Sequence, residues 1–387
     1  MKQYRLLFLS WRDIRSPLKG GAETFTHELM KGLVKKGHQV THFSPQYSGT
    51  LSVEVIDGIE YRRKGNMFTV LYHSANFYFR NHQIIHYVVD QCNTHRFFSF
   101  LWVKRSKRVF FIHQLTREIW FYHAKFPFHY LGFVLEPLLL WLNRNDRCIT
   151  VSESTKHDLL KIGFRDHNVT ILPEGLDIPP LKQEDFYQKE ETPTFLYIGR
   201  MAKYKGIHDA LVAYREFNKE YPKSKFWVIG AFNQEYFSKT IEQELIKSSL
   251  SYAITDGRPD NKVDVSFMGF VSSKKKIEYM SRAHALVFPS IREGWGLTIS
   301  ESAVCGTPSI VYDAPGVRDA IAFGKAGYLV KQRGPTYIVS YMKKVIEEVE
   351  DYENMVQNAF VFSKRLDWTK TAEQFEDKIL YHHIQKE

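Results

Sequence analysis

Short apolar runs alternate along this chain with longer amphipathic segments. The first run, Tyr4–Ser10, is followed by a polar loop that ends in Gly20 and Gly21. Apolar positions then recur at helical spacing over Ala22–Lys36, and Gln39–Ser44 is again short and apolar. A strand, a loop, a helix and a strand in this order predict one unit of a parallel sheet.

The same alternation occupies both halves of the chain. In the first half we expect further strands at Ile84–Val89, Val109–Ile112, Cys148–Ser152 and Val169–Leu172. In the second half we expect strands at Thr194–Gly199, Phe226–Gly230, Val265–Phe267, Ala285–Pro289 and Ser309–Tyr312, with helices over 207–220, 273–282 and 297–305. The prediction is an α/β fold of two doubly wound parallel-sheet, Rossmann-like domains that face a central cleft, where such sheets bind ligands.

The length supports two domains, because 387 residues exceed the size at which a single core stops growing. A stretch with three prolines and a charged run separates the two alternating patterns and is typical of a linker. We therefore place the first domain at 1–178, the linker at 179–193 and the second domain at 194–365.

Composition narrows the class of protein. A hydrophobic content of 44% with 25% charged residues is that of a soluble globular protein. The three cysteines, Cys92, Cys148 and Cys305, are an odd number without metal-ligand spacing, which argues against a disulfide framework and favours a reducing cytoplasm. The apolar run near Met1 is too short for a signal peptide, so we interpret it as a buried first strand.

Two carboxylates stand eight residues apart in the second half, and a glycine-rich turn follows the first of them. If the segment after Gly296 is helical, Glu301 lies on about the same side as Glu293. The free amides and the positive dipole end of such a helix favour a phosphate or a sugar oxygen near Gly294 to Leu297. The alternative is an ordinary exposed helix with two solvated glutamates.

Two cations follow the strand expected at Thr194–Gly199. Arg200 can bind phosphate oxygens through its guanidinium fork, and Lys205 offers a compact point charge. A solvated basic loop is the alternative interpretation. The phosphate-binding interpretation gains weight because Glu293 and Glu301 are expected at the same edge of the same sheet.

Several motifs together resemble one known family. They are Gly199-Arg200 with Lys205-Gly206, Met268-Gly269-Phe270-Val271, Pro289-Ser290, Glu293-x7-Glu301, Ala303-Val304-Cys305-Gly306-Thr307-Pro308, and, in the first half, Gly20-Gly21-Ala22-Glu23, Phe111-Ile112-His113-Gln114, Val151-Ser152-Glu153-Ser154 and Pro173-Glu174-Gly175-Leu176-Asp177. This set looks like the signature of the family 4 retaining glycosyltransferases (glycosyl transferases group 1), which have the two-domain GT-B fold. The resemblance reaches Trp368, whose segment, 366–387, is similar to the terminal helix that crosses back onto the first domain.

The resemblance implies a role for each matching residue. Arg200 and Lys205 would bind the donor diphosphate, Glu301 the ribose, and Glu293 the transferred sugar. The donor-binding residues it implies are Gly20, Gly21, Arg200, Lys205, Gly269, Phe270, Val271, Glu293, Gly294, Trp295, Gly296, Leu297 and Glu301, and the catalytic ones are Glu293, His113, Arg200 and Lys205. The first domain would lie on the acceptor side and the second would bind the nucleotide sugar, with the base near Gly269, Phe270 and Val271. The family usually has Asn where this chain has Glu174, which leaves the role of that side chain in doubt.

No metal and no cofactor beyond the donor sugar nucleotide is expected. The loops expected at the cleft lack an Asp-x-Asp pair, so the fixed cations and helix dipoles would stabilise the leaving diphosphate. His82 and His86 stand four residues apart but have no evident third ligand, and a structural role is the preferred interpretation. Asp90 and Asn93 would contact substrate or shape a turn. The absence of a P-loop and of a GxGxxG weakens kinase and dehydrogenase interpretations.

Basic and aromatic residues are concentrated between Gln91 and Tyr130. This stretch contains seven Lys and Arg residues and one acid, Glu118. Aromatic residues are interleaved with them, among them Phe97, Phe98, Phe100, Trp102, Trp120, Phe121, Tyr122, Phe126 and Phe128. Such a composition predicts contact with anionic lipid. Nucleic acid is disfavoured because no recognition motif accompanies the cations, and a solvated basic face with aromatics in the core is the remaining alternative. Residues 126–142 are apolar, but Glu136, Pro137 and the limited length argue against a membrane span.

These inferences define an expected function with two alternatives. We expect a cytoplasmic retaining transferase, peripheral on the inner face of the membrane, that moves a hexose-type sugar from a nucleotide diphosphate sugar to a lipid-linked or cell-surface glycan precursor. The family is thought to react on one face of the sugar, so no protein nucleophile is assigned. One alternative is a synthase or phosphorylase with a soluble sugar acceptor, and the other is a non-catalytic nucleotide-sugar-binding subunit.

Overall fold

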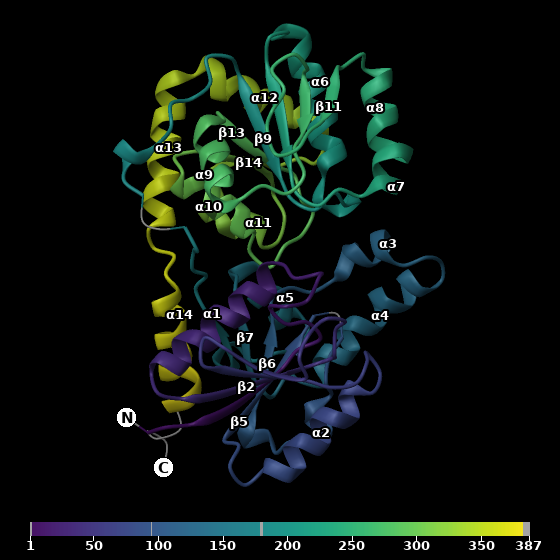
Figure 1. Ribbon diagram of the computed structural model, residues 1–387, viewed down its shortest axis with the longest axis vertical. Coiled ribbons are helices and arrows are strands. Elements are labelled where there is room, and N and C mark those ends of the chain that lie inside the picture. Colours follow the sequence, from purple (N-terminus) through teal and green to yellow (C-terminus); the bar gives the residue numbers. More distant parts are fainter. Residues whose placement is uncertain (1, 94, 179–180, 382–387) are drawn as a thin grey trace. The chain divides into compact units, whose positions relative to one another are not determined.

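The computed structural model describes residues 2–93, 95–178 and 181–381. The chain divides into two compact units (Figure 1). Unit 1 comprises residues 1–175 and 367–387, and unit 2 comprises residues 176–366. Both are α/β units built on a mainly parallel sheet, as the alternating sequence pattern predicted.

The sheet of unit 1 has eight strands in the order β3-β4-β2-β1-β5-β6-β7-β8. The strands are β1 (Arg5–Leu9), β2 (Gln39–Ser44), β3 (Val53–Ile56), β4 (Ile59–Arg63), β5 (Tyr87–Cys92), β6 (Arg108–Ile112), β7 (Arg147–Thr150) and β8 (Val169–Ile171). All neighbours pair in parallel except β3 and β4. The helices are α1 (Gly21–Lys35), α2 (Val70–Asn81), α3 (Trp120–His123), α4 (Phe128–Trp141) and α5 (Glu153–Lys161).

Strand β5 begins three residues later than the apolar run predicted. Ile84 is exposed and Ile85 donates its amide to Asn81 O, so both belong to the turn that leaves α2. The strand instead includes Asp90, which was expected to follow it. Asp90 is tolerated in the sheet because its carboxylate accepts the amides of Phe97 and Ser99. It therefore shapes the loop after β5, as the turn interpretation of Asp90 proposed.

The C-terminal segment packs on unit 1. Helix α14 (Trp368–Phe375) lies beside α1, where a Cβ added at Gly32 would meet Ala372 Cβ at 2.5 Å. The Trp368 indole covers Gly175 so closely that any side chain there would collide with it. Gly32 and Gly175 are thus the small residues that let this helix seat on unit 1. Residues 382–387 of the expected terminal helix lie outside the described residues.

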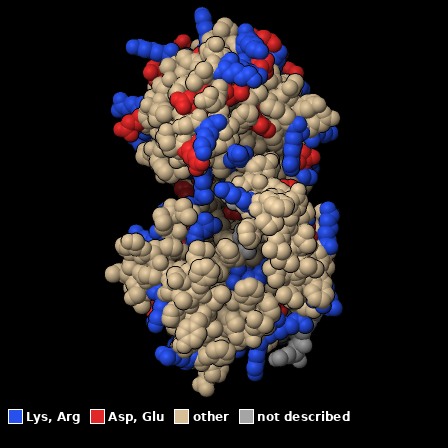
Figure 2. Space-filling view, turned by 90° about the vertical axis from the view of Figure 1, so that its right-hand side faces the viewer, with Lys and Arg blue, Asp and Glu red and all other residues tan. Residues whose placement is uncertain are grey.

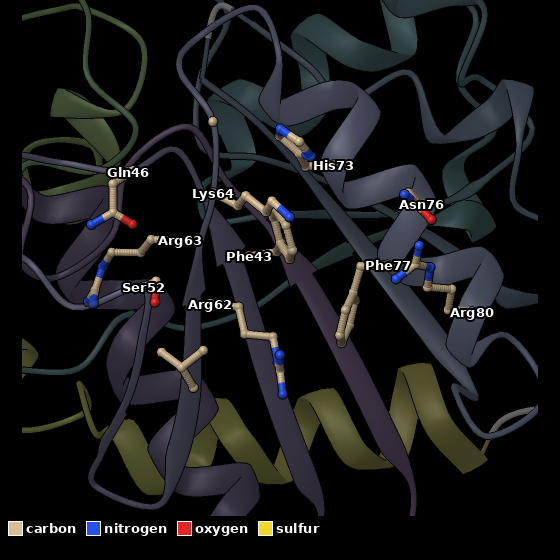
Figure 3. A pocket seen from close by; sticks show the side chains of 12 residues that line it. Phe43, Gln46, Ser52, Arg62, Arg63, Lys64, His73, Asn76, Phe77 and Arg80 are labelled. Atoms are coloured by element: carbon tan, nitrogen blue, oxygen red, sulfur yellow. The ribbon is translucent and has the colours of Figure 1, made fainter.

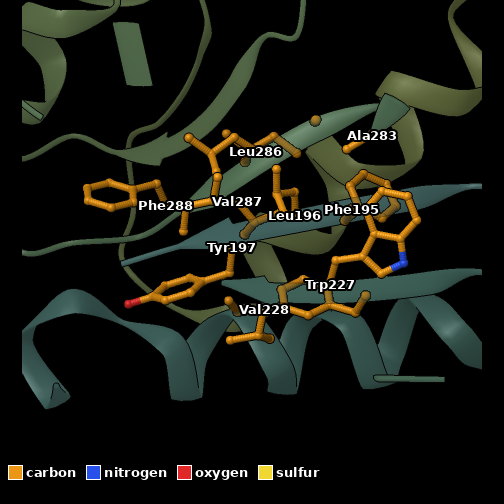
Figure 4. Close-up of a cluster of buried hydrophobic side chains, with 14 of the residues drawn as sticks. Phe195, Leu196, Tyr197, Trp227, Val228, Ala283, Leu286, Val287 and Phe288 are labelled. Atoms are coloured by element: carbon orange, nitrogen blue, oxygen red, sulfur yellow. The ribbon is translucent and has the colours of Figure 1, made fainter. Parts of the chain in front are cut away.

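The sheet of unit 2 has seven parallel strands in the order β11-β12-β10-β9-β13-β14-β15. They are β9 (Thr194–Ile198), β10 (Lys225–Ile229), β11 (Tyr252–Ile254), β12 (Val265–Phe267), β13 (Ala285–Phe288), β14 (Ser309–Tyr312) and β15 (Tyr328–Val330). The central strands are buried on both faces. Figure 4 shows their interleaved side chains, among them Phe195, Leu196, Trp227 and Leu286.

Helices surround this second sheet. They are α6 (Ile207–Glu220), α7 (Gln234–Tyr236), α8 (Glu242–Lys247), α9 (Ser273–Arg282), α10 (Leu297–Val304), α11 (Val317–Ala320), α12 (Pro335–Glu347) and α13 (Val349–Ser363). Helices α6 and α9 span the predicted residues, and α10 ends one residue earlier than predicted.

Much of the stretch interpreted as a linker packs on unit 2; residues 179–180 within it lie outside the described residues. Lys189 Nζ donates to the carbonyl oxygens of Ala283 and Gly306 and to Thr307 Oγ1, at 2.7, 3.0 and 2.6 Å. Burial lowers the pKa of this ammonium to about 7. These polar contacts satisfy the buried side chain and hold this part of the predicted linker on unit 2.

Candidate functional site in unit 2 and its counterpart in unit 1

Lys205 and Glu293 form an ion pair at the carboxyl edge of the second sheet. Lys205 Nζ lies 2.5 Å from Glu293 Oε1, and the Ser290 hydroxyl donates to the same oxygen at 2.7 Å. Lys205 comes from the loop after β9, whereas Ser290 and Glu293 come from the loop after β13. Two neighbouring strands therefore deliver opposite charges to one point, as the sequence predicted for this edge.

Two glycines allow these loops to approach so closely. Gly206 has a φ of +75°, and a Cβ there would lie 2.1 Å from Pro289 O. Gly316 has a φ of +77°, and a Cβ there would lie 2.0 Å from Glu293 O. Pro315 O also accepts the Glu293 amide at 3.0 Å. The 313–316 loop thus holds the backbone of Glu293, a contact that local sequence reasoning missed because it joins distant segments.

The pair sets the electrostatics of the site. Burial opposes the charge on Lys205, but the Glu293 carboxylate and the Tyr204 hydroxyl group outweigh it, so the pKa of the ammonium is raised. Lys205 is consequently charged at neutral pH. Most of the Glu293 side chain is buried, and its negative charge is balanced by that ammonium. An arriving anion would compete with Glu293 for Lys205.

Arg200 differs from Lys205 because it is exposed. It lies two residues after the end of β9, and among the described residues it has no acidic partner within ion-pair distance. Its guanidinium is therefore available for a bidentate contact with an oxyanion.

Glu301 lies on α10 and is also paired. Lys276 Nζ, from α9, lies 2.7 Å from Glu301 Oε1. Lys276 was not singled out in the sequence, because an ion pair between two helices leaves no local signal. At the start of α10, Gly296 adopts a φ of +103°, and Trp295 Nε1 donates to Ser300 Oγ at 2.9 Å. The turn through Gly294 and Leu297 is thereby fixed at the amino end of the helix.

The turn after β12 presents an aromatic ring. Gly269 has a φ of +62°, and its carbonyl accepts the amide of Gly230. Phe270 is 83% exposed, and Val271 is half-buried against the core of unit 2. A large exposed ring on a fixed turn is suited to stacking on a planar ligand.

In unit 1, Gly20 and Gly21 begin helix α1. The Gly20 amide donates to Glu23 Oε2 at 2.6 Å, and Arg12 Nε lies 3.1 Å from the other oxygen of that carboxylate. Gly20 is exposed and carries no side chain, so an anion can approach the helix start, although Glu23 already occupies one of its amides.

His113 is buried at the end of β6. Its Nε2 accepts a hydrogen bond from the Gln91 amide at 3.1 Å, and its ring packs against Phe25 and Phe111. Burial lowers the pKa of the imidazole to about 3. His113 is therefore neutral at physiological pH, and with Nε2 accepting, Nδ1 carries the proton. This geometry suits a hydrogen-bond donor and not an acid.

Glu174, which stands where the family usually has Asn, is also buried. Its Oε2 has no hydrogen-bond partner, and burial raises the pKa of the carboxyl group well above its usual value. This shift favours the protonated carboxyl group, which, like an amide, can donate and accept hydrogen bonds.

The two histidines weighed as a metal pair bind the main chain instead. His82 Nδ1 bonds to Phe79 O, and His86 Nδ1 accepts the Arg5 amide. Within the described part of the chain, no three His, Cys, Asp or Glu side chains are grouped as metal ligands would be. Asn93 bonds weakly to Glu23 through its side chain, at 3.5 Å.

Some of the basic and aromatic side chains between Gln91 and Tyr130 are buried, and others are exposed. Arg96 is buried and donates to Leu139 O and Asn143 Oδ1, while Arg108 pairs with Asp146 and Lys107 binds backbone carbonyls. These three cations are structural, so the prediction of seven cations on one surface was wrong. Lys104, Arg105 and Lys125 are exposed.

The exposed side of α3 and α4 is strongly apolar. Its exposed side chains are Phe121, Tyr122, Phe126, Phe128, Tyr130, Leu131, Val134, Leu135, Leu138, Leu139, Trp141 and Leu142, and we call them the α3–α4 apolar face. Glu136 points inward instead, and its carboxylate accepts the amides of Thr116 and Arg117. Of the nine aromatic residues that the alternative interpretation placed in the core, Phe121, Tyr122, Phe126 and Phe128 are exposed, so that alternative is wrong for these four.

Cations border this face. Arg117 lies over the Phe133 ring at 4.0 Å and Arg144 over the Trp141 ring at 3.3 Å. Figure 2 views the side on which α3 and α4 lie in Figure 1; the surface of unit 1 there is broadly uncharged, with Lys and Arg at its margins and little Asp or Glu. Among the residues described, no helix is both long enough and apolar enough to cross a membrane.

Family models match both halves of the chain. Residues 19–178 match "Glycosyltransferase Family 4", and residues 181–362 match "Glycosyl transferases group 1". The chain belongs to the family 4, group 1 glycosyltransferases, and its fold is GT-B.

Individual relatives are distant. The capsular polysaccharide biosynthesis glycosyltransferase CapM of Staphylococcus aureus is 24% identical over 222 residues, which cover 54% of each chain. The chain spans about half the length of the curated relatives it matches. Sucrose-phosphate synthase from Thermosynechococcus elongatus has a TM-score of 0.75 at 17% identity, with 99% of both chains covered. Anabaena HepE in complex with UDP-glucose has a TM-score of 0.70 at 15% identity, with 97% of this chain and 99% of that chain covered. At these identities the structural matches show the fold alone.

Proposed function

We propose that this chain is a retaining glycosyltransferase that moves a sugar from a nucleotide diphosphate sugar to a hydroxyl acceptor. The observation that carries the proposal is the Lys205–Glu293 pair beside the exposed Arg200 at the carboxyl edge of the second sheet. This edge is where parallel sheets bind ligands. The structure of HepE, which shares this fold, contains UDP-glucose, so uridine donors are the first to test.

In this proposal each residue has a defined task. Arg200 and Lys205 bind the diphosphate and neutralise the charge that develops as it leaves. Glu293 accepts hydrogen bonds from hydroxyls of the transferred sugar once the phosphates draw Lys205 away from it. Glu301 binds the ribose, and Phe270 stacks on the base. In unit 1, His113 donates from Nδ1 to the sugar, and Gly20 and Gly21 let the phosphates approach the start of α1.

The reaction proceeds on one face of the sugar without a protein nucleophile. The bond between the anomeric carbon and the phosphate oxygen breaks as the acceptor oxygen bonds to the same face of that carbon. The hydroxyl proton of the acceptor passes to the leaving phosphate oxygen. The fixed cations supply the charge stabilisation, so the proposal requires no divalent metal.

We further propose that the acceptor is lipid-linked or a cell-surface glycan precursor, and that unit 1 docks on an anionic membrane from the cytoplasmic side. The α3–α4 apolar face, bordered by Lys and Arg, supports this. Burying apolar side chains at the headgroup boundary adds to the attraction of anionic lipids, without a membrane-spanning helix. CapM, which resembles this chain, is named a capsular polysaccharide biosynthesis glycosyltransferase.

A panel of nucleoside diphosphates and their sugars in a thermal-shift assay tests the donor side of the proposal. The matched donor should raise the melting temperature, and purified protein should hydrolyse it slowly in the absence of acceptor. Binding without any turnover would favour the non-catalytic subunit. Turnover on free sugars or sugar phosphates would favour the soluble acceptor that the likeness to sucrose-phosphate synthase suggests.

A further inference from the structure

Unit 1 contains a polar cleft whose lining residues are not part of the proposed donor site. It has a volume of about 590 Å³ and lies between the edge of the sheet at β2, β3 and β4 and helix α2 (Figure 3). Its size is in the range of small-molecule sites. The residues that contribute from α2 are His73, Asn76, Phe77 and Arg80, which share one face of the helix because they are spaced at i, i+3, i+4 and i+7.

The lining of this cleft carries positive charge. Arg62, Arg63, Lys64 and Arg80 contribute to it, and none of the described residues that line it is Asp or Glu. Arg63 is directed to the opposite side of β4 from Arg62 in Figure 3, and it is neutralised by Asp13 and Glu54. The charge that faces a ligand therefore comes from the other three cations.

Arg62 is only partly neutralised. Its Nη2 lies 2.6 Å from Glu60 Oε1, but its buried Nε has no hydrogen-bond partner. Its guanidinium carbon lies 5.1 Å from the centre of the Phe77 ring, within cation–π distance. An unpaired buried N–H is costly unless a ligand satisfies it.

Lys64 and Arg80 have no acidic partner in the described parts of the chain, and both are exposed. The Asn76 side chain is half-buried and forms no hydrogen bond to the residues that the structure describes. Two free cations and a free amide thus remain at the mouth of one cleft. Such a set can bind an oxyanion and the hydroxyl groups next to it.

The floor of the cleft is aromatic. The Phe43 and Phe77 rings lie 5.6 Å apart, centre to centre, at an interplanar angle of 40°. Aromatic side chains with a few convergent polar groups are typical of small-molecule sites, and the C–H faces of a sugar ring can pack on such rings.

We propose that this cleft binds a sugar that carries a phosphate or carboxylate group, with Lys64 and Arg80 on the anion, Asn76 on a hydroxyl and Phe77 under the ring. This interpretation of the ligand rests on the proposed function. In that function, the sugar is part of the acceptor. The ligand class follows from the charge, the volume and the aromatic floor together.

Calorimetry on the full chain tests this inference, with the nucleoside diphosphate selected in the thermal-shift panel in excess so that the donor site is occupied. The probes are glucose 6-phosphate, glucuronate, glucose and inorganic phosphate. At least one anionic sugar should bind about tenfold or more tightly than glucose and than inorganic phosphate. The double variant Lys64→Ala/Arg80→Ala should lose at least about tenfold in affinity for it.

The control is Arg5→Ala/Lys35→Ala, which removes one Arg and one Lys, both exposed, near the amino edge of the same sheet. It should bind as the unmodified chain does. If the cleft variant and the control bind the anionic sugar with equal affinity, the proposed site is wrong. If inorganic phosphate binds as tightly as the anionic sugar, the proposal that the ligand includes a sugar is wrong.

Two further readouts keep the result unambiguous. If the cleft variant does not fold, the salt dependence of anionic-sugar binding to the unmodified chain tests the inference instead. Binding by exposed cations should weaken as the Debye length falls from about 10 Å to about 3 Å between 0.1 and 1 M salt. Salt-insensitive binding overturns the inference. The affinity for the selected nucleoside diphosphate, measured on the same samples, reports on the donor site in unit 2 separately, so loss of one site does not imitate loss of the other.

Discussion

The ammonium of Lys205 lies 2.5 Å from the carboxylate of Glu293, although 88 residues separate them in the chain. In the proposed function these two groups have different ligands, the diphosphate and the transferred sugar. Without a ligand they satisfy each other, which avoids an uncompensated buried charge. Donor binding therefore replaces one ion pair with two new sets of contacts, and the two residues should respond differently to substitution.

Replacement of Glu293 by Gln should separate binding from transfer. The change removes the negative charge that competes for Lys205, so affinity for a nucleoside diphosphate should be unchanged or higher. Transfer should fall, because a hydrogen bond to a charged group is worth about 1.5–3 kcal/mol, or roughly 10- to 150-fold in kcat/KM. Glu301→Gln provides the contrast and should weaken nucleotide binding itself. If Glu293→Gln loses nucleotide affinity as Glu301→Gln does, the assigned roles are wrong.

His113 should contribute to the pH dependence of stability. Its pKa is about 3 in the folded chain and 6.5 in the unfolded chain, so the unfolded state binds more protons between these values. Its contribution is fully present above about pH 6.5 and is lost as the pH falls toward 3, with a slope of up to about 1.4 kcal/mol per pH unit. His113→Gln should reduce this slope in denaturant titrations from pH 7 to 4.5.

His82→Gln is the control for that series, because His82 is exposed and its ring bonds only to the main chain. It should leave the slope unchanged. An unaltered slope in His113→Gln would show that His113 is not a buried neutral group in solution.

Transfer should not depend on a divalent metal. The loops at the carboxyl edge of the second sheet lack an Asp-x-Asp pair, and Arg200 and Lys205 already supply two positive charges. Product formation should therefore continue in excess EDTA at the rate seen without it. Loss of turnover that Mg²⁺ or Mn²⁺ restores would mean that a metal, and not these cations, stabilises the leaving group.

Membrane binding should depend on the α3–α4 apolar face. Leu131→Glu/Leu138→Glu places two carboxylates on exposed positions of α4, so it should spare the fold and reduce sedimentation with anionic vesicles by roughly tenfold or more. Ile246→Glu/Ile254→Glu is the matched control, since those side chains in unit 2 are 63% and 59% exposed, against 53% and 61% for the α4 pair. A chain that stays in the supernatant with anionic vesicles at low salt would favour a soluble acceptor.

The alternation of apolar runs predicted most strands because central parallel strands are buried on both faces. It gave no indication of the β3–β4 hairpin, where Glu54, Glu60 and Arg62 interrupt the apolar pattern at the edge of the sheet. The Asp57-Gly58 pair between these strands is a common hairpin-turn sequence and was the one local signal available. Edge strands carry charge, so hydrophobic periodicity is weakest there.

The candidate site was predictable where strand ends carry charged residues, as at Arg200, Lys205 and Glu293. The residues that hold these site residues in place were not predictable in this way. Gly316 matters because its missing Cβ admits the Glu293 carbonyl, and Lys276 because it faces Glu301 from another helix. Such contacts join segments that the sequence separates, and only the fold brings them together.

The most direct test of the donor site is calorimetric binding of the nucleoside diphosphate selected in the thermal-shift panel to Arg200→Ala, Lys205→Ala and Lys203→Ala. Lys203 is exposed in the same loop and has no acidic partner within the described residues, so it controls for charge. The proposal predicts that each of the first two variants loses about 1.5–3 kcal/mol of binding free energy while Lys203→Ala binds normally. Unchanged affinity in both Arg200→Ala and Lys205→Ala would contradict it.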